Sequence, residues 1–332
     1  MNTIALSGLK AENPLAFLAA LGTLSLLQEG SKERPRMSWE QHAGTWVPAL
    51  RSGSLRSQGD VVEALLAIHT QRDLDAELGW EKDIMKVTRP QVRDQLSLHD
   101  LDSESTRLLA ACVAELPPRR DGEHVHYTPF RLMPRVGRAR FLDTALRESH
   151  NGVEHLRSCL FETWCYMPDT QSMRWDPASL VPARALMAEA PTHAKPHGVP
   201  GAILLAIRGL ASFPLITQRD RARSAGMVNH SRFVWPIWRD PLQLPVIRML
   251  LSMRSLYELD DAHHNGNRSN TDERLPQAPD QITGLWRQHP LRTDVEAWLH
   301  AHGVIATFSA PRVRRGEDDE ALGWGVPRIV GE

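Results

Sequence analysis

The sequence predicts an α+β fold in which antiparallel sheets and helices pack together, with a central buried helix near the N-terminus. Three observations predict this class. Strand-like and helix-like segments form clusters instead of alternating strictly, which argues against a doubly wound parallel sheet. Apolar residues cover nearly every face of the segment after Asn13-Pro14, as expected for a helix that is buried on all sides. The chain also lacks the Gly-x-Gly-x-x-Gly turn of dinucleotide-binding folds.

The first elements follow from the signals at their ends. Residues 3–7 alternate as a short strand does. Asn13 is a good N-cap and Pro14 is favoured at the first helical position, so a helix should begin there and run to about Leu27. Gly22 weakens this helix by about 1 kcal/mol relative to alanine, so we expect it to allow a close approach by a neighbouring element.

The remaining elements are predicted from apolar periodicity and turn residues. Helices are expected over residues 58–69, 103–116, 138–165 with a break near 151–152, 201–212, 244–255 and 291–302. Strands are expected over residues 37–40 and 45–50, which form a hairpin, and over 172–175, 213–217, 231–238, 304–314 and 324–330. Pro/Gly-rich turns and a polar stretch mark the expected linkers.

Composition narrows the functional classes. A chain of 332 residues with 42% apolar content is long enough for about two domains. We expect an N-terminal α+β domain over residues 1–118 and a second α+β region over 119–332, with a polar linker near 260–280. The three cysteines lack the paired spacing of a zinc site, which indicates a reducing cytoplasm and no structural metal. The longest apolar stretch, 15–27, is shorter than the ~20 residues that span a bilayer, so a cytoplasmic protein without a membrane partner is expected.

Positive charge is concentrated in two parts of the chain. The formal net charge is −1, yet residues 119–147 carry a net +4 and residues 208–254 a net +6. We call these the first and second basic islands. Arginine makes up 34 of the 39 basic residues, and its planar guanidinium suits phosphates and guanine edges, although a G+C-rich genome would give the same bias.

Ten residues of these islands and of a smaller cluster are predicted to bind nucleic acid. In the first island, four arginines lead into a predicted helix N-terminus, where phosphates bind well. In the second, a loop before an aromatic strand should reach base edges. Near the C-terminus, two arginines share one face of a predicted strand. The ten are Arg131, Arg135, Arg138 and Arg140; Arg219, Arg221, Arg223 and Asn229; and Arg312 and Arg314.

No catalytic constellation is convincing. Two imidazoles, His124 and His126, would share one face of a strand, but the sequence assigns them no third ligand. Asp261, His263 and His264 lie in the polar linker without the helical frame of a metal site. Gly-x-Ser-x-Gly and Gly-x-x-x-x-Gly-Lys are absent. We therefore predict no catalytic residue, no metal ligand and no cofactor.

Several blocks of the sequence resemble proteins encoded in type I CRISPR loci of the I-U/I-G kind, the large subunit of the Cascade effector or its equivalent. The blocks are Leu6-Ser7-Gly8-Leu9 followed by residues 13–24, then 128–143, 172–177 (SMRWDP), 201–214 and Trp235-Pro236-Ile237-Trp238. They are scattered over most of the chain, and none is a catalytic signature. The predicted C-terminal strands depart from the helical bundle with which many large subunits end, which implies a separate small subunit or none.

This resemblance implies a non-enzymatic role in antiviral defence. A large subunit recognises the protospacer-adjacent motif in duplex DNA and supports R-loop formation, while guide RNA pairing reads the target sequence. The implied partners are the other Cascade subunits of a ribonucleoprotein complex, guide RNA, target double-stranded DNA and a recruited helicase-nuclease.

Two alternatives remain open at this point. The first is a metal-dependent nuclease, and divalent-metal-dependent cleavage would support it; its candidate residues are His124, His126, Asp261, His263 and His264. The second is a scaffold whose islands grip acidic partner proteins, in which case nucleic acid should not compete for the partner.

Overall fold

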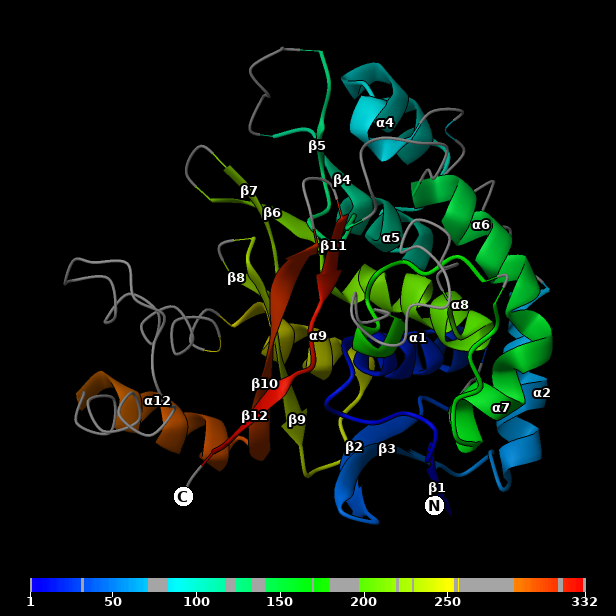
Figure 1. Cartoon of the computed structure of the whole chain (residues 1–332), viewed down its shortest axis with the longest axis vertical. Helices are drawn as coiled ribbons and strands as arrows, with labels where there is room; N and C mark the ends of the chain where they lie inside the picture. Colours follow the sequence, from blue (N-terminus) through cyan, green and yellow to red (C-terminus); the bar gives the residue numbers. More distant parts are fainter. Residues whose placement is uncertain are drawn as a thin grey trace, which may run out of the picture.

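A computed structural model of the chain (Figure 1) confirms a mixed fold of helices and antiparallel sheets. It describes residues 2–30, 33–70, 80, 83–116, 123–132, 141–168, 170–179, 197–218, 221–228, 230–253, 256, 290–315 and 319–330. In this part of the chain, no helix combines the length and the apolar content that a membrane crossing requires.

The N-terminal sheet has three antiparallel strands in the order β1 (Asn2–Ala5), β3 (Thr45–Ser52) and β2 (Arg36–His42). The predicted hairpin is confirmed as β2 and β3. Its turn places Ala43 and Gly44 at positive φ, 49° and 84°, which is the backbone of a tight hairpin turn.

The remaining strands form a larger sheet and two hairpins, all antiparallel. The larger sheet has the order β11 (Asp319–Leu322), β10 (Val304–Arg315), β9 (Arg232–Trp238) and β8 (Met227–Val228), and β12 (Val326–Ile329) also pairs with β10. The two hairpins are β4 (Val113–Ala114) with β5 (His126–Tyr127), and β6 (Leu215–Gln218) with β7 (Arg221–Ser224).

Most helices lie toward the right of the view in Figure 1, whereas α9 lies near its centre and α12 at its lower left. The α-helices are α1 (Pro14–Gly30), α2 (Gln58–His69), α4 (Arg89–Ser97), α5 (Glu104–Cys112), α6 (Phe141–Asn151), α7 (Leu156–Phe161), α8 (Pro200–Gly209), α9 (Leu244–Ser252) and α12 (Pro290–Ala301). Short 3-10 helices are η1 (Ile84–Lys86), η2 (Val153–His155), η3 (Pro177–Ser179) and η4 (Leu210–Ser212). The break predicted near residues 151–152 is present, because Gly152 separates α6 from η2 and α7.

The buried N-terminal helix is confirmed. The Asn13 side chain accepts hydrogen bonds from the backbone N–H groups of Leu15 (2.9 Å) and Ala16 (3.4 Å), as an N-cap does. Every residue from Pro14 to Leu27 is buried. That this helix lies at the centre of an N-terminal domain stays a prediction.

Helices α1 and α8 lie side by side and touch backbone to backbone (Figure 1). A Cβ atom added to Gly22 would lie 1.7 Å from the Leu205 carbonyl oxygen, and one added to Gly209 would lie 2.0 Å from the Leu18 carbonyl oxygen. The expected reason for Gly22, a close approach by a neighbouring element, is therefore confirmed.

Aromatic side chains join α1 to both main sheets. The ring of Phe17 stacks on Trp39 of β2 and on Trp235 of β9, with centroids 5.9 and 5.7 Å apart. Trp238 of β9 donates a 2.7 Å hydrogen bond to the carbonyl oxygen of Met37. One hydrophobic cluster thus contains residues from both predicted domains, from Ile4 to Val330. The boundary at residue 118 stays a prediction.

Two local predictions outside the second basic island were wrong. Residues 172–175 form no strand, because Arg174 has φ of 65° and its N–H donates to the Ser172 hydroxyl, so the chain turns. The helix predicted over 103–116 ends at Cys112, because Val113 and Ala114 pair with β5. Helix α4 was not predicted from the sequence, although Thr88 and Gln91 form a capping box at its start.

Candidate nucleic-acid interface

The second basic island carries the β6–β7 hairpin, which stands near the upper end of the molecule in Figure 1. The prediction of a loop over residues 219–230 was wrong, since β7 and β8 fall within it. The sequence Arg221-Ala222-Arg223-Ser224 alternates long basic and small side chains, which is the period of a strand.

The two faces of this hairpin differ in chemistry. Ala222 and Ser224 are buried, so their face is turned toward the body of the protein. On the opposite face Ile216 pairs with Arg223; Ile216 is 52% exposed and Arg223 is half-buried. Arg221 precedes Arg223 by two residues and therefore occupies the same face of the strand. The hairpin thus has a basic outer face.

The positive charge of Arg223 is not compensated within the described part of the chain, because no carboxylate there pairs with it. The cross-strand partner of Arg221 is Gln218, which is uncharged. Arg219, Asn229 and the side chain of Arg221 lie outside what the structure describes. Their contacts with nucleic acid stay predictions.

The β10–β11 hairpin carries arginines in a different setting. Arg312 forms an ion pair with Glu320 and donates a 3.3 Å hydrogen bond to the carbonyl oxygen of His230. Arg314 is the cross-strand partner of Glu320, and its own side chain lies outside the described residues. Each arginine position here therefore lies near a carboxylate, which makes this hairpin a weaker attractor of phosphate than β6–β7.

Arg131 of the first island is part of the protein's internal structure. Its guanidinium is 4% exposed and donates to one oxygen of Asp83 through Nε (3.0 Å) and a terminal nitrogen (2.7 Å). The other Asp83 oxygen accepts hydrogen bonds from the backbone N–H groups of Ile84 (3.0 Å) and Phe141 (3.1 Å). The residues on either side of 133–140 thus bind one carboxylate.

The other predicted residues of the first island, Arg135, Arg138 and Arg140, lie outside the described residues. Their role as phosphate ligands stays a prediction.

The histidines considered as metal ligands lie on strand edges. His124 forms a β-bridge with Thr88, and His126 of β5 pairs with Ala114 of β4. Where the structure describes the chain, no three histidine, cysteine or acidic side chains are grouped as a metal site requires. Asp261, His263 and His264 lie outside that part.

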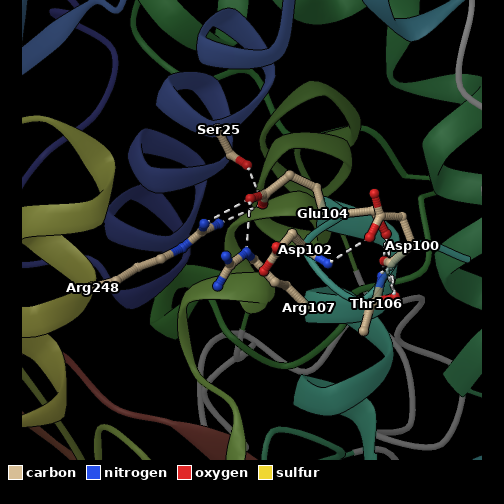
Figure 2. Close-up of polar contacts among 8 residues, drawn as sticks. Ser25, Asp100, Asp102, Glu104, Thr106, Arg107 and Arg248 are labelled. Atoms are coloured by element: carbon tan, nitrogen blue, oxygen red, sulfur yellow. Dashed lines mark hydrogen bonds and ion pairs between the residues drawn. The ribbon is translucent and has the colours of Figure 1, made fainter. Parts of the chain in front are cut away.

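A polar cleft with a volume of about 360 Å³ opens between α1, α5 and α9. It is lined by Ser25, Gln28, Glu29, Asp102, Ser103, Glu104, Leu244 and Arg248. Figure 2 shows that Glu104 at the start of α5 receives hydrogen bonds from Arg248 of α9 and from the Ser25 hydroxyl (2.9 Å), with Arg107 nearby at 3.5 Å. The cleft thus carries the carboxylates of Glu29, Asp102 and Glu104 beside the guanidinium of Arg248.

The charge of Glu104 is stabilised inside the protein. Burial acts to raise the pKa of this carboxyl, but the hydrogen bonds and charge of Arg248, together with Ser25 and Arg107, outweigh burial and hold the pKa below its ordinary value. Sequence reasoning missed this pair because its members are 144 residues apart and neither belongs to a local motif.

Two blocks that carry the CRISPR resemblance meet at a buried carboxylate. Asn13 donates a 2.9 Å hydrogen bond to Asp176, whose same oxygen accepts from the N–H of Ala178 at 3.0 Å. Burial raises the pKa of Asp176, although Ala178, Asn13 and Tyr166 act to lower it. The contact ties the start of α1 to residues 172–177 and indicates a structural reason for both blocks.

Comparison of the chain with protein-family models and with curated proteins gives no match.

Proposed function

We propose that the chain is a non-enzymatic DNA-binding subunit of a type I CRISPR effector complex that acts in the cytoplasm in antiviral defence. It recognises the protospacer-adjacent motif in duplex DNA and supports R-loop formation. The observation that carries the proposal is the β6–β7 hairpin, in which positions 221 and 223 share the strand face opposite the buried Ala222 and Ser224.

The shape and chemistry of this hairpin suit a duplex. The major groove of B-DNA admits a two-stranded β-ribbon, and β6 and β7 pair only with each other among the described strands. Arginine binds phosphates and the O6/N7 edge of guanine with two parallel hydrogen bonds. A basic ribbon whose other face packs on the protein can therefore contact backbone and base edges together.

The assignment to a CRISPR complex rests on the sequence blocks that resemble I-U/I-G large subunits. In such a complex the other Cascade subunits and guide RNA hold the target strand, and a helicase-nuclease is recruited for cleavage. Base pairing to the guide then reads most of the target sequence, so the protein needs only a few direct base contacts.

The test is flank-dependent binding by the assembled complex. The chain is co-expressed with the other proteins of its locus and a guide RNA and purified through a tag on this chain. Binding is then measured on target duplexes with randomised flanking bases. We expect binding to depend on the flank and to weaken by about tenfold or more in the R221Q/R223Q double variant.

A matched control is R36Q/R51Q, which removes the same charge from a cross-strand arginine pair at the other end of the molecule (Figure 1). We expect this variant to bind as the unmodified complex does. The proposal is wrong if the chain does not co-purify with RNA-containing particles. It is also wrong if complexes with R221Q/R223Q and with R36Q/R51Q bind the target duplex with the same affinity. Divalent-metal-dependent cleavage lost in His124→Ala would favour the nuclease instead.

A further inference from the structure

We infer that Gly226 is a positioning residue for DNA binding, because it sets the direction in which the β6–β7 hairpin leaves the core. This inference rests on the function proposed above. Gly226 lies in the turn between β7 and β8 and has φ of 83°, a left-handed backbone that side chains with a Cβ rarely adopt.

The base of the hairpin is closed by hydrogen bonds and by rings. The N–H of Ala225 donates to the carbonyl oxygen of Pro214 at 3.3 Å, and the Ser224 hydroxyl lies 3.2 Å from the carbonyl oxygen of Phe213. Gly226 itself accepts a 2.8 Å hydrogen bond from the N–H of Val234 on β9. The two ends of the hairpin are thereby attached to each other and to the main sheet.

The space at Gly226 is filled from two sides. A Cβ atom there would lie 2.9 Å from two ring atoms of Phe213, which precedes β6, and 2.9 Å from a ring atom of Phe233 on β9. Such distances are shorter than real carbon contacts, so an added side chain forces residue 226 and Phe213 together to move away from the ring of Phe233.

Phe213 is also packed, against Phe17, Phe130 and Phe233 at centroid distances of 6.5, 5.5 and 5.4 Å, but it leads into a two-stranded hairpin that can shift with it. Phe233 packs against Phe130 and Trp235 at centroid distances of 5.0 and 4.8 Å, and its strand is hydrogen-bonded on both sides, by β8 and β10. The β6–β7 hairpin has no third strand among the described residues. A side chain at position 226 therefore turns the hairpin and moves its basic face.

The experiment measures duplex affinity and its salt dependence for the purified full chain and the variant G226A, with a fluorescent DNA duplex as the probe. We expect G226A to weaken binding by about fivefold or more and to lower the slope of log affinity against log salt. In the G226A background, R221Q/R223Q should cost less than about threefold, because the arginines have already lost their contacts.

The control for backbone strain is G44A. Gly44 has nearly the same φ, 84°, but a Cβ there meets nothing within 4 Å. This variant should keep the affinity and the salt slope of the unmodified chain.

If G226A does not fold, Phe213→Leu tests the same contact from the other side. Phe308→Leu is its matched control, because Phe308 is equally buried and stacks on Trp235 away from the hairpin base. We expect a lower salt slope in F213L only.

The outcomes separate the two ideas. If R221Q/R223Q leaves affinity unchanged in the otherwise unmodified chain, the proposed DNA face is wrong. Another outcome refutes only the role of Gly226. In it, R221Q/R223Q loses duplex affinity, G226A and F213L keep the affinity of the unmodified chain, and R221Q/R223Q costs as much affinity in those backgrounds as in the unmodified chain.

Discussion

The contribution of Glu104 to the stability of the fold depends on Arg248, which lies 144 residues away in the sequence. The side chains of Glu104 and Arg248 are each only 16% exposed, and their ion pair joins the two predicted domains. Removing one member of a buried pair leaves the other charge without compensation, which usually costs about 3 kcal/mol or more. The pair is therefore a test of internal electrostatics.

We predict that Glu104→Gln lowers the free energy of unfolding by about 3 kcal/mol at neutral pH. Because the pKa of Glu104 is depressed in the folded state, its stabilisation is present above the unfolded-state pKa and is lost as pH falls through the folded value. The difference from the unmodified chain should shrink below the ordinary glutamate pKa of 4.5. Urea unfolding at a series of pH values measures both effects.

The exposed pair of Arg93 and Glu115 provides the comparison, since Arg93 is 68% exposed. Glu115→Gln should cost less than about 1 kcal/mol. If Glu104→Gln and Glu115→Gln lower the free energy of unfolding equally, burial does not strengthen the ion pair of Glu104.

At the scale of single residues, local sequence predicted caps but not charge pairs. Asn13 was identified as the N-cap of α1 because a cap depends only on its neighbours along the chain. Arg131 was expected on phosphate, and the sequence could not show Asp83, which lies 48 residues earlier and binds its guanidinium. Net charge counts residues and does not show which of them face each other.

At the scale of elements, the contact between α1 and α8 leads to a prediction about Gly22. Alanine in a helix is favoured over glycine by about 1 kcal/mol, yet a Cβ at Gly22 would overlap the Leu205 carbonyl. We predict that G22A destabilises the protein by about 3 kcal/mol, because the helices must separate. Thermal and urea unfolding give the measurement.

Gly59 in α2 is the matched control for this substitution, since a Cβ there meets its nearest atom at 3.4 Å, an ordinary contact. G59A should be neutral or stabilise by up to about 1 kcal/mol. If G22A keeps the free energy of unfolding of the unmodified chain, α1 and α8 can move apart without a loss of stability.

Many elements with clear local signals were predicted, including the β2–β3 hairpin, whereas the short strands β7 and β8 were not. The bounds of α2 were predicted at residues 58–69 from its apolar periodicity and are confirmed. Strand β6 overlaps the strand predicted over 213–217, whereas β7 was interpreted as part of a loop, because a four-residue strand rich in arginine carries little strand propensity and is held by pairing with β6. The alternation of arginine with small residues over 221–224 is the sequence pattern that indicates this strand.

At the scale of the whole molecule, the shared core predicts that the N-terminal region does not fold alone. Residues 1–118 contain α1, but its partners α8 and Trp235 lie beyond residue 118. We predict that a 1–118 fragment lacks a cooperative thermal transition and regains one when co-expressed with residues 119–332. Circular dichroism and two-dimensional NMR of both samples check this expectation.

A cooperative transition in the isolated fragment would show that the contact with α8 is an interface between independent domains. The fold class itself was predictable from the sequence, because the order of strand and helix segments is a local property. The single hydrophobic cluster was not, since it depends on which elements meet in space.

Asp83 also affects how far the length of a neighbouring segment can change. Arg131 and Phe141 bind the same carboxylate, so the chain before and after residues 133–140 is brought together by that side chain. Loop-closure entropy grows slowly with length, about 0.6 kcal/mol per doubling. A change in the number of residues between Arg131 and Phe141 would therefore cost little in stability as long as Asp83 holds both ends together.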